Sequence, residues 1–93
     1  MLYVESAKYQ SDYKIIVTFN DGSTHLVDFE KTIFIDSRAI VSALKDLTVF
    51  KDFSIQHHTI TWGNGLDFAP EFIKDCSIKL LEKTAEPRDS AKK

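Results

Sequence analysis

Histidine, cysteine and carboxylate side chains are the residues of this chain whose types could support chemistry. His57 and His58 are adjacent, and adjacent side chains in a strand point to opposite faces. Because no Cys or third His lies at a suitable spacing, the pair predicts a solvated turn rather than a metal site. Cys76 lies four residues from both Phe72 and Leu80, which predicts a small buried residue rather than a nucleophile. We therefore expect no metal and no cofactor.

Two carboxylates are framed by apolar neighbours, Asp28 and Asp67. Paired acids would suggest hydrolysis, but nothing in the spacing of these two places them at a usable separation. We expect Asp67 to accept hydrogen bonds from the turn or from the helix that begins at Pro70. We expect Asp28 to pair with Lys14 or Arg38. Since no nucleophile–base pair can be assembled, the chain is not expected to be an enzyme.

The composition is typical of one small soluble domain. The chain has 93 residues, a net charge of −2, and 43 % apolar and 12 % aromatic residues. Because Lys and Arg are not in excess, direct binding of nucleic acid is not expected. A single Cys excludes an internal disulfide and fits a reducing compartment. No segment predicts a signal peptide or a membrane span, so we expect a cytoplasmic protein that does not bind membranes.

Residues 13–29 alternate in a way that predicts a β-hairpin. A two-residue turn would place a carboxylate opposite Ile15. A three-residue loop over 20–22, with a left-handed glycine, places Val27 opposite Ile15 instead. We favour the three-residue loop because it gathers the apolar residues on one face, and it also sets His25 near that face.

The remaining pattern predicts a single α+β domain over residues 1–81, with its strands in a small antiparallel sheet. Before the first hairpin we expect a weaker strand over 2–9 with a bend near Ser6-Ala7. After it we expect a main helix over 37–47, capped by Asp36 or Ser37, and one more helical turn within 48–52. A second hairpin over 53–62 around His57-His58 and a short helix from Pro70 follow. Residues 77–81 either continue that helix or begin a strand. The polar segment 82–93 predicts a disordered tail.

Five residues are candidates for a partner or ligand surface. Ile16 and Leu26 lie on the second face of the first hairpin, where a partner or a second copy could bury them unless the first strand or the C-terminal helix covers them. Trp62 is either a core anchor, which we favour, or a ligand platform. With His25 and Asp67, these residues form the candidate set.

Three motifs in series resemble those of a known family. They are F-N-D-G-S with V-D-F at residues 19–29, L-K-D with a downstream Phe at residues 44–50, and ITWGNGLDFAPEF at residues 60–72. The chain resembles the family of small bacterial domains of unknown function numbered twenty-four forty-two, over roughly residues 4–73. It departs from the family's pattern at Gly63, where Pro is usual, at His57-His58, where Gly or Asp is commoner, and by extending over 77–93.

The resemblance implies an α+β domain built from a hairpin, a helix and further strands, and it supplies no established catalytic residues. Family members occur alone or fused to a helix-turn-helix domain, and no such pattern follows in this sequence. Some are encoded beside another small protein, in arrangements that resemble toxin–antitoxin pairs. We therefore expect a protein-interaction module that binds a small protein partner or itself. One form of such a module is the antitoxin-like half of such a pair. The alternative is a small-molecule-sensing domain with a pocket near Trp62, Asp67 and His25.

Overall fold

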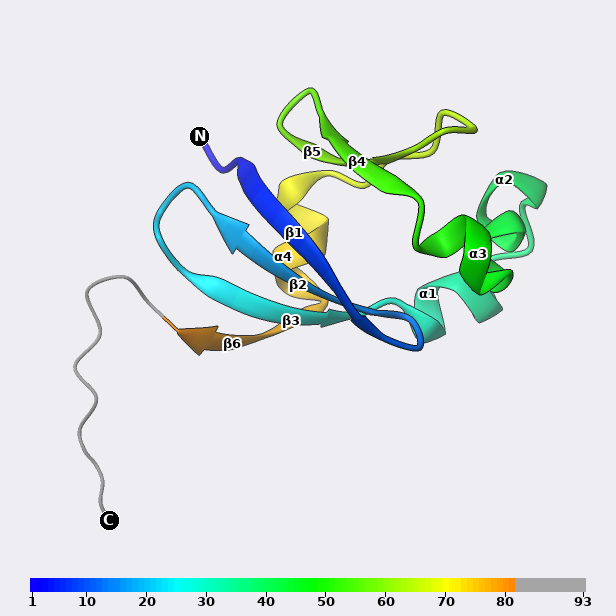
Figure 1. Ribbon diagram of the computed structural model, residues 1–93, viewed down its shortest axis with the longest axis horizontal. Coiled ribbons are helices and arrows are strands. Elements are labelled where there is room, and N and C mark those ends of the chain that lie inside the picture. Colours follow the sequence, from blue (N-terminus) through cyan, green and yellow to red (C-terminus); the bar gives the residue numbers. More distant parts are fainter. Residues whose placement is uncertain (82–93) are drawn as a thin grey trace, which may run out of the picture.

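The computed structural model describes residues 1–81, and the predicted tail, residues 82–93, lies outside this range (Figure 1). The elements are β1 (Val4–Ser11), β2 (Lys14–Phe19), β3 (Thr24–Asp28), α1 (Glu30–Ile35), α2 (Ala39–Ser42), the 3-10 turn η1 (Ala43–Lys45), α3 (Leu47–Phe50), β4 (Phe53–Gln56), β5 (Thr59–Trp62), α4 (Pro70–Asp75) and β6 (Ser77–Leu81). This arrangement confirms the α+β class.

The strands form two sheets, whereas we expected one. Strands β1, β2, β3 and β6 form an antiparallel sheet in the order β1-β2-β3-β6, and β4 and β5 form a second sheet of two strands. The second edge of β3 is occupied by β6, so the second hairpin cannot join the sheet there. Instead the hairpin meets the start of β1, where the Val4 N–H donates to the His58 carbonyl at 2.9 Å. In Figure 1 the β4–β5 hairpin accordingly lies beside the N-terminal end of β1.

The register of the first hairpin is the predicted one. Ile15 pairs with Val27 and Val17 pairs with His25, so the apolar side chains of β2 and β3 share one face. Gly22 adopts the left-handed conformation expected for a three-residue loop, with φ of 88°. Along both strands buried and half-exposed residues alternate, as expected for a sheet with one face against the core.

β1 carries the predicted irregularity near its start. Its pairing with β2 shifts between Val4 and Ser6, and again between Tyr9 and Ser11. An extra residue in one strand of an antiparallel pair bends that strand and strengthens its twist. The bend lets Val4 enter the core while the rest of β1 continues along β2.

The second hairpin is confirmed in register and turn. Ile55 pairs with Ile60, and Phe53 pairs with Trp62. The turn residues His57 and His58 both have positive φ, 52° and 68°, as a two-residue hairpin loop requires.

The prediction of one continuous main helix over 37–47 is wrong. Helical structure is split into α2, η1 and α3, with a break at Asp46, whose ψ of 114° is extended. The Asp46 side chain accepts the Thr48 N–H at 2.9 Å, so it caps the start of α3. Apolar periodicity predicted the buried Val41 and Leu44 correctly, but a short aspartate side chain competes with the helical hydrogen bonds at this point.

Neither of the two predicted caps, Asp36 or Ser37, occupies the N-cap position of α2. The Asp36 carboxylate accepts the Arg38 N–H at 3.0 Å and binds the Arg38 guanidinium, with Oδ2 2.6 Å from one guanidinium nitrogen. These hydrogen bonds lower the pKa of Asp36 to about 2. The N-terminal flank of α2 is Arg38, which makes no side-chain cap.

Helix α1 was not predicted. Its residues are rich in β-branched and aromatic side chains, which do not favour a helix. One tertiary and one local feature override this preference. Ile33 is fully buried, and the Asp28 carboxylate accepts the Glu30 N–H at 3.0 Å where the helix begins. Asp28 also lies 3.9 Å from Lys14, one of its two predicted partners.

The C-terminal part of the described chain resolves the open alternative in favour of a strand. Helix α4 begins at Pro70, as predicted, and ends at Asp75. Residues 77–81 then form β6, which pairs with β3. Cys76, predicted to be buried in a longer helix, is half-buried where α4 ends. The stripe that suggested the longer helix is not buried, since Phe72 and Leu80 are both exposed.

Candidate functional site

The side of the four-stranded sheet that points away from the core carries a row of apolar side chains. Ile16 of β2 lies opposite Leu26 of β3, and Leu26 lies opposite Ile78 of β6. We call these three residues the outer row. Lys8 of β1 lies opposite Ile16 and ends the row on that side. Ile16 and Leu26 are partly buried and Ile78 is 69 % exposed, so the row becomes more accessible to solvent toward β6.

The outer row runs onto β6, which is an edge strand. Within residues 1–81, β6 has a sheet neighbour only on the side of β3. Ile78 is 69 % exposed and Leu80 is 52 % exposed. Large exposed apolar side chains on an edge strand are unusual, because such an edge is a template for pairing with another chain. The β6 edge therefore combines two features of an interaction surface, apolar side chains and an edge backbone.

The opposite edge of the sheet, formed by β1, is protected. The two shifts in its pairing interrupt its regular backbone. Its first residue, Val4, donates to the His58 carbonyl of the second hairpin. Lys8 is exposed on this strand, and the Lys51 ammonium lies 5.5 Å from the centre of the Tyr9 ring. Irregular pairing, charge and coverage are the usual means by which proteins block pairing at an edge.

His25 lies inside the molecule rather than on a surface. It is 4 % exposed, and its ring nitrogens lie 3.0 Å from Ser23 Oγ and 2.7 Å from Ser77 Oγ. The Ser77 hydroxyl in turn donates to the Lys74 carbonyl. His25 thus links the first hairpin to the end of α4 and to β6, which is a structural role.

Asp21 extends this network at the loop of the first hairpin. Its carboxylate accepts the Ser23 hydroxyl at 2.6 Å and the Ser23 N–H at 2.9 Å, and it lies 3.0 Å from the Lys74 ammonium. The hydrogen bonds from Ser23, supported by Lys74, hold the pKa of Asp21 well below its usual range. Lys74 belongs to α4, so the loop and the helix are joined by an exposed ion pair.

Trp62 is a core anchor. It is 2 % exposed, and its ring Nε1–H donates to the Phe50 carbonyl at 2.8 Å. Four phenylalanines surround the ring: Phe29, Phe50, Phe53 and Phe68. A buried indole with its N–H satisfied in this way packs the core and leaves no face for a ligand.

Asp67 lies exposed on the loop before α4, and it does not cap that helix. The residue before Pro70 is Ala69, which makes no side-chain cap. The loop is braced instead by Asn64, whose Oδ1 accepts the Leu66 N–H at 3.1 Å and whose Nδ2 donates to the Ile40 carbonyl at 3.1 Å. An asparagine in a glycine turn was the signal for this role, because its side chain can both accept and donate.

The five candidate residues are therefore not one site. Ile16 and Leu26 share the outer row, whereas His25, Trp62 and Asp67 lie elsewhere. His25 and Trp62 are both buried, whereas Asp67 is exposed on a loop, so the three residues do not line the expected ligand pocket. Sequence reasoning missed Ile78. The alternation of apolar residues at 78 and 80 was its signal, and it became readable once residues 77–81 were known to be a strand.

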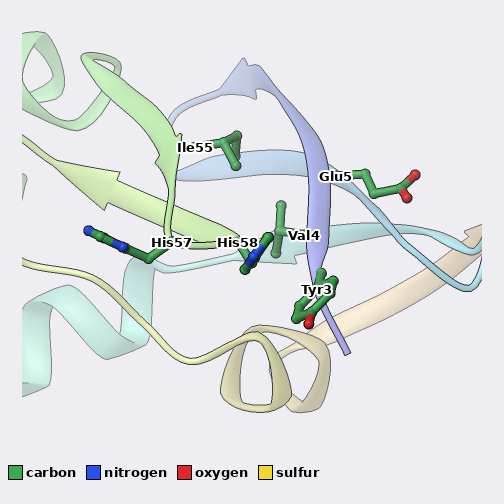
Figure 2. A pocket seen from close by; sticks show the side chains of 6 residues that line it. All are labelled: Tyr3, Val4, Glu5, Ile55, His57 and His58. Carbon is green, nitrogen blue, oxygen red and sulfur yellow. The ribbon is translucent and has the colours of Figure 1, made fainter. Parts of the chain in front are cut away.

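A surface cleft of about 730 Å³ lies between the start of β1 and the turn of the second hairpin (Figure 2). Tyr3 and His58 stack across it, with ring centres 4.1 Å apart. Figure 2 shows His57 and Glu5 pointing away from this stacked pair. The cleft thus offers aromatic surface but no converging acid and base.

Metal-ligand chemistry has no cluster to support it in the described part of the chain. No group of three or more His, Cys, Asp or Glu side chains is placed to hold an ion there. In the same residues, no helix has the length and apolar character needed to cross a membrane.

Comparison with known proteins identifies the family. Residues 4–78 match the family described as "Protein of unknown function (DUF2442)". The chain belongs to the DUF2442 family. No curated protein and no solved structure matches it. In this DUF2442 domain the match ends at residue 78, so it includes all three residues of the outer row but not residues 79–81 of β6.

Proposed function

We propose that this DUF2442 domain is a protein-interaction module that docks a small protein partner on the outer face of its four-stranded sheet. The observation that carries the proposal is the outer row, Ile16, Leu26 and Ile78, whose side chains line up across three strands and stay partly or largely accessible to solvent. Contiguous apolar side chains that remain accessible to solvent and are rimmed by polar ones are a feature of interaction sites. Lys8 and the Lys14–Asp28 pair supply the polar rim.

The partner we propose is the product of a neighbouring gene, with this chain as the antitoxin-like half of the pair. The resemblance of some family members to two-gene toxin–antitoxin arrangements supports this choice. The outer face is compatible with an antitoxin-like role, because a sheet surface of this kind can bind a partner without catalytic groups of its own.

Co-expression of the chain with the neighbouring gene's product tests the proposal. We expect the two proteins to co-purify and any growth inhibition by the partner to be relieved. Leu26→Lys should abolish both effects, because it places a charge in the middle of the apolar contact. Ile35→Lys is the matched control, since Ile35 is 79 % exposed on α1 and outside the outer row. Absence of co-purification and of relief, or full binding by Leu26→Lys, would count against the proposal.

The cleft of Figure 2 supports a second candidate function, the binding of a small aromatic molecule. The stacked Tyr3–His58 pair supplies a flat surface on which such a molecule could extend the stack. A thermal-shift screen of aromatic compounds is the test, with His58→Asn as the variant because Asn retains access to positive φ. A ligand that stabilises the wild type and this variant equally would not be using the cleft.

A further inference from the structure

We infer that two copies of this chain associate by pairing their β6 strands antiparallel, which joins the two four-stranded sheets into one. The inference goes beyond the proposed function, because it names a second copy of the chain as a further partner. It uses the edge of β6 rather than the outer face alone.

The direction of the backbone groups on β6 follows from the hydrogen bonds of the first hairpin. Phe19 donates its N–H to the Ser23 carbonyl, and Phe29 donates to the Tyr13 carbonyl. Odd-numbered residues of β3 therefore face β2, and even-numbered ones face β6, because successive residues alternate. Leu26 and its partner Ile78 thus direct their backbone groups toward each other.

It follows that the neighbours of Ile78 present their backbone groups on the other side of β6. Ser77 and Lys79 direct their N–H and C=O groups away from β3. These are the groups that a further antiparallel strand would bind.

Charge excludes one register for pairing between two copies. Lys79 is the only charged residue of β6. A two-fold axis at Lys79 would set two ammonium groups directly opposite each other, which is unfavourable. An axis at Ile78 sets Lys79 opposite Ser77 of the second copy and Ile78 opposite its own equivalent. In this register the two Ser77–Lys79 pairs exchange about four main-chain hydrogen bonds.

The same register continues the outer row across the interface. Ile16, Leu26 and Ile78 of one copy meet the same three residues of the other in reverse order. The two Ile78 residues form a non-hydrogen-bonded pair, in which side chains approach most closely. The apolar row then crosses six strands without interruption.

Other occupants of the edge fit less well. Residues 82–93 contain no Val, Ile, Leu, Met or aromatic residue, so this chain's own C-terminal segment cannot supply apolar side chains. Face-to-face stacking of two outer rows would rest on three apolar side chains a copy, well short of the roughly 800 Å² per partner of a stable interface. Edge pairing adds backbone hydrogen bonds to that small apolar contact.

Light scattering after size exclusion, over a concentration series of the purified full chain, tests the association. We expect a dimer that dissociates on dilution. Ile78→Lys should be monomeric throughout, and the control Ile35→Lys should dimerise as the wild type does. Circular dichroism and Trp62 fluorescence establish that both variants fold. A wild type that stays monomeric, or an Ile78→Lys variant that still dimerises, overturns the inference.

Cysteine cross-linking tests the register. In a Cys76→Ser background, Ile78→Cys should form an intermolecular disulfide on oxidation, because the paired Cα atoms would lie within about 4.4–6.8 Å. Leu80→Cys, equally on β6, should cross-link much less, and stronger cross-linking there would overturn the register. A monomeric wild type that still binds the neighbouring gene's product would remove this inference and leave the proposed function standing. A dimer that does not bind that product would remove the proposed function and leave this inference standing.

Discussion

The two edges of the four-stranded sheet differ in how they meet solvent. At β1 the pairing is irregular, Lys8 is exposed, and Val4 is tied to His58 of the second hairpin. At β6 the side chains of Ile78, Lys79 and Leu80 are all exposed, and two of the three are apolar. β6 also has one shift in its pairing and an exposed Lys79, but no described residue covers its outer edge as the second hairpin covers the start of β1. That difference directs the search for partners to β6.

Truncating the buried residue at the β1 edge should give the largest effect. Val4→Ala is expected to lower the free energy of unfolding by about 2 kcal/mol, because Val4 is only 2 % exposed and its loss leaves a cavity. Ile78→Ala should change it by less than about 0.5 kcal/mol in the monomer, where Ile78 is largely exposed. Urea denaturation followed by Trp62 fluorescence measures both. Equal losses would contradict the difference between the edges.

A smaller effect is expected from removing the Asn20 side chain, which binds the backbone of the residues before β1. Asn20 accepts the Tyr3 N–H at 2.8 Å and donates to the Met1 carbonyl at 2.8 Å. Asn20→Ala should cost about 1 kcal/mol, since both hydrogen bonds are exposed to water. Amide hydrogen exchange should become faster at Tyr3 and Val4 and stay unchanged in β6. Gln56→Ala, which removes an exposed amide contact in the other sheet, is the control.

The smallest effect should be a change in acid sensitivity at the junction of the first hairpin and α4. The pKa of Asp21 is depressed in the folded chain by Ser23 and Lys74. A depressed pKa contributes stability that is present above the unfolded value of 3.8 and is lost as pH falls toward the folded one. Asp21→Asn should therefore be less stable than the wild type at pH 7, with the difference shrinking below about pH 4. Denaturation at several pH values checks this. A difference that stays constant with pH would contradict it.

Local patterns in the sequence were enough to predict both hairpins. Alternation set the register of Ile15 with Val27, because only one register gathers the apolar residues. The same reasoning set the His57-His58 turn, since the flanking residues pair well only around a two-residue loop.

The remaining parts depend on contacts between distant residues. Helix α1 forms because Ile33 is buried, against the preference of its own residues. Residues 77–81 become a strand because β3 has an edge for them, which no local pattern reveals. The residues of the candidate surface also differ in whether local sequence patterns or distant contacts reveal them. Ile16 and Leu26 were predicted from one hairpin, but Ile78 required knowledge of the sheet order.

The attachment of β6 also has a consequence for the order of folding. The His25–Ser77 contact that holds this strand joins residues 52 positions apart, whereas β1, β2 and β3 are joined by short turns. Contacts between distant residues carry a larger loop-closure cost and form later. We expect the three-stranded meander to form first and β6 to dock late, so substitutions at Ser77 should accelerate unfolding without slowing refolding. Stopped-flow kinetics would show this, and slowed refolding would refute it. Until β6 docks, the edge of β3 is open to the β6 strand of another copy, so a late-docking strand gives strand exchange between molecules a route during folding.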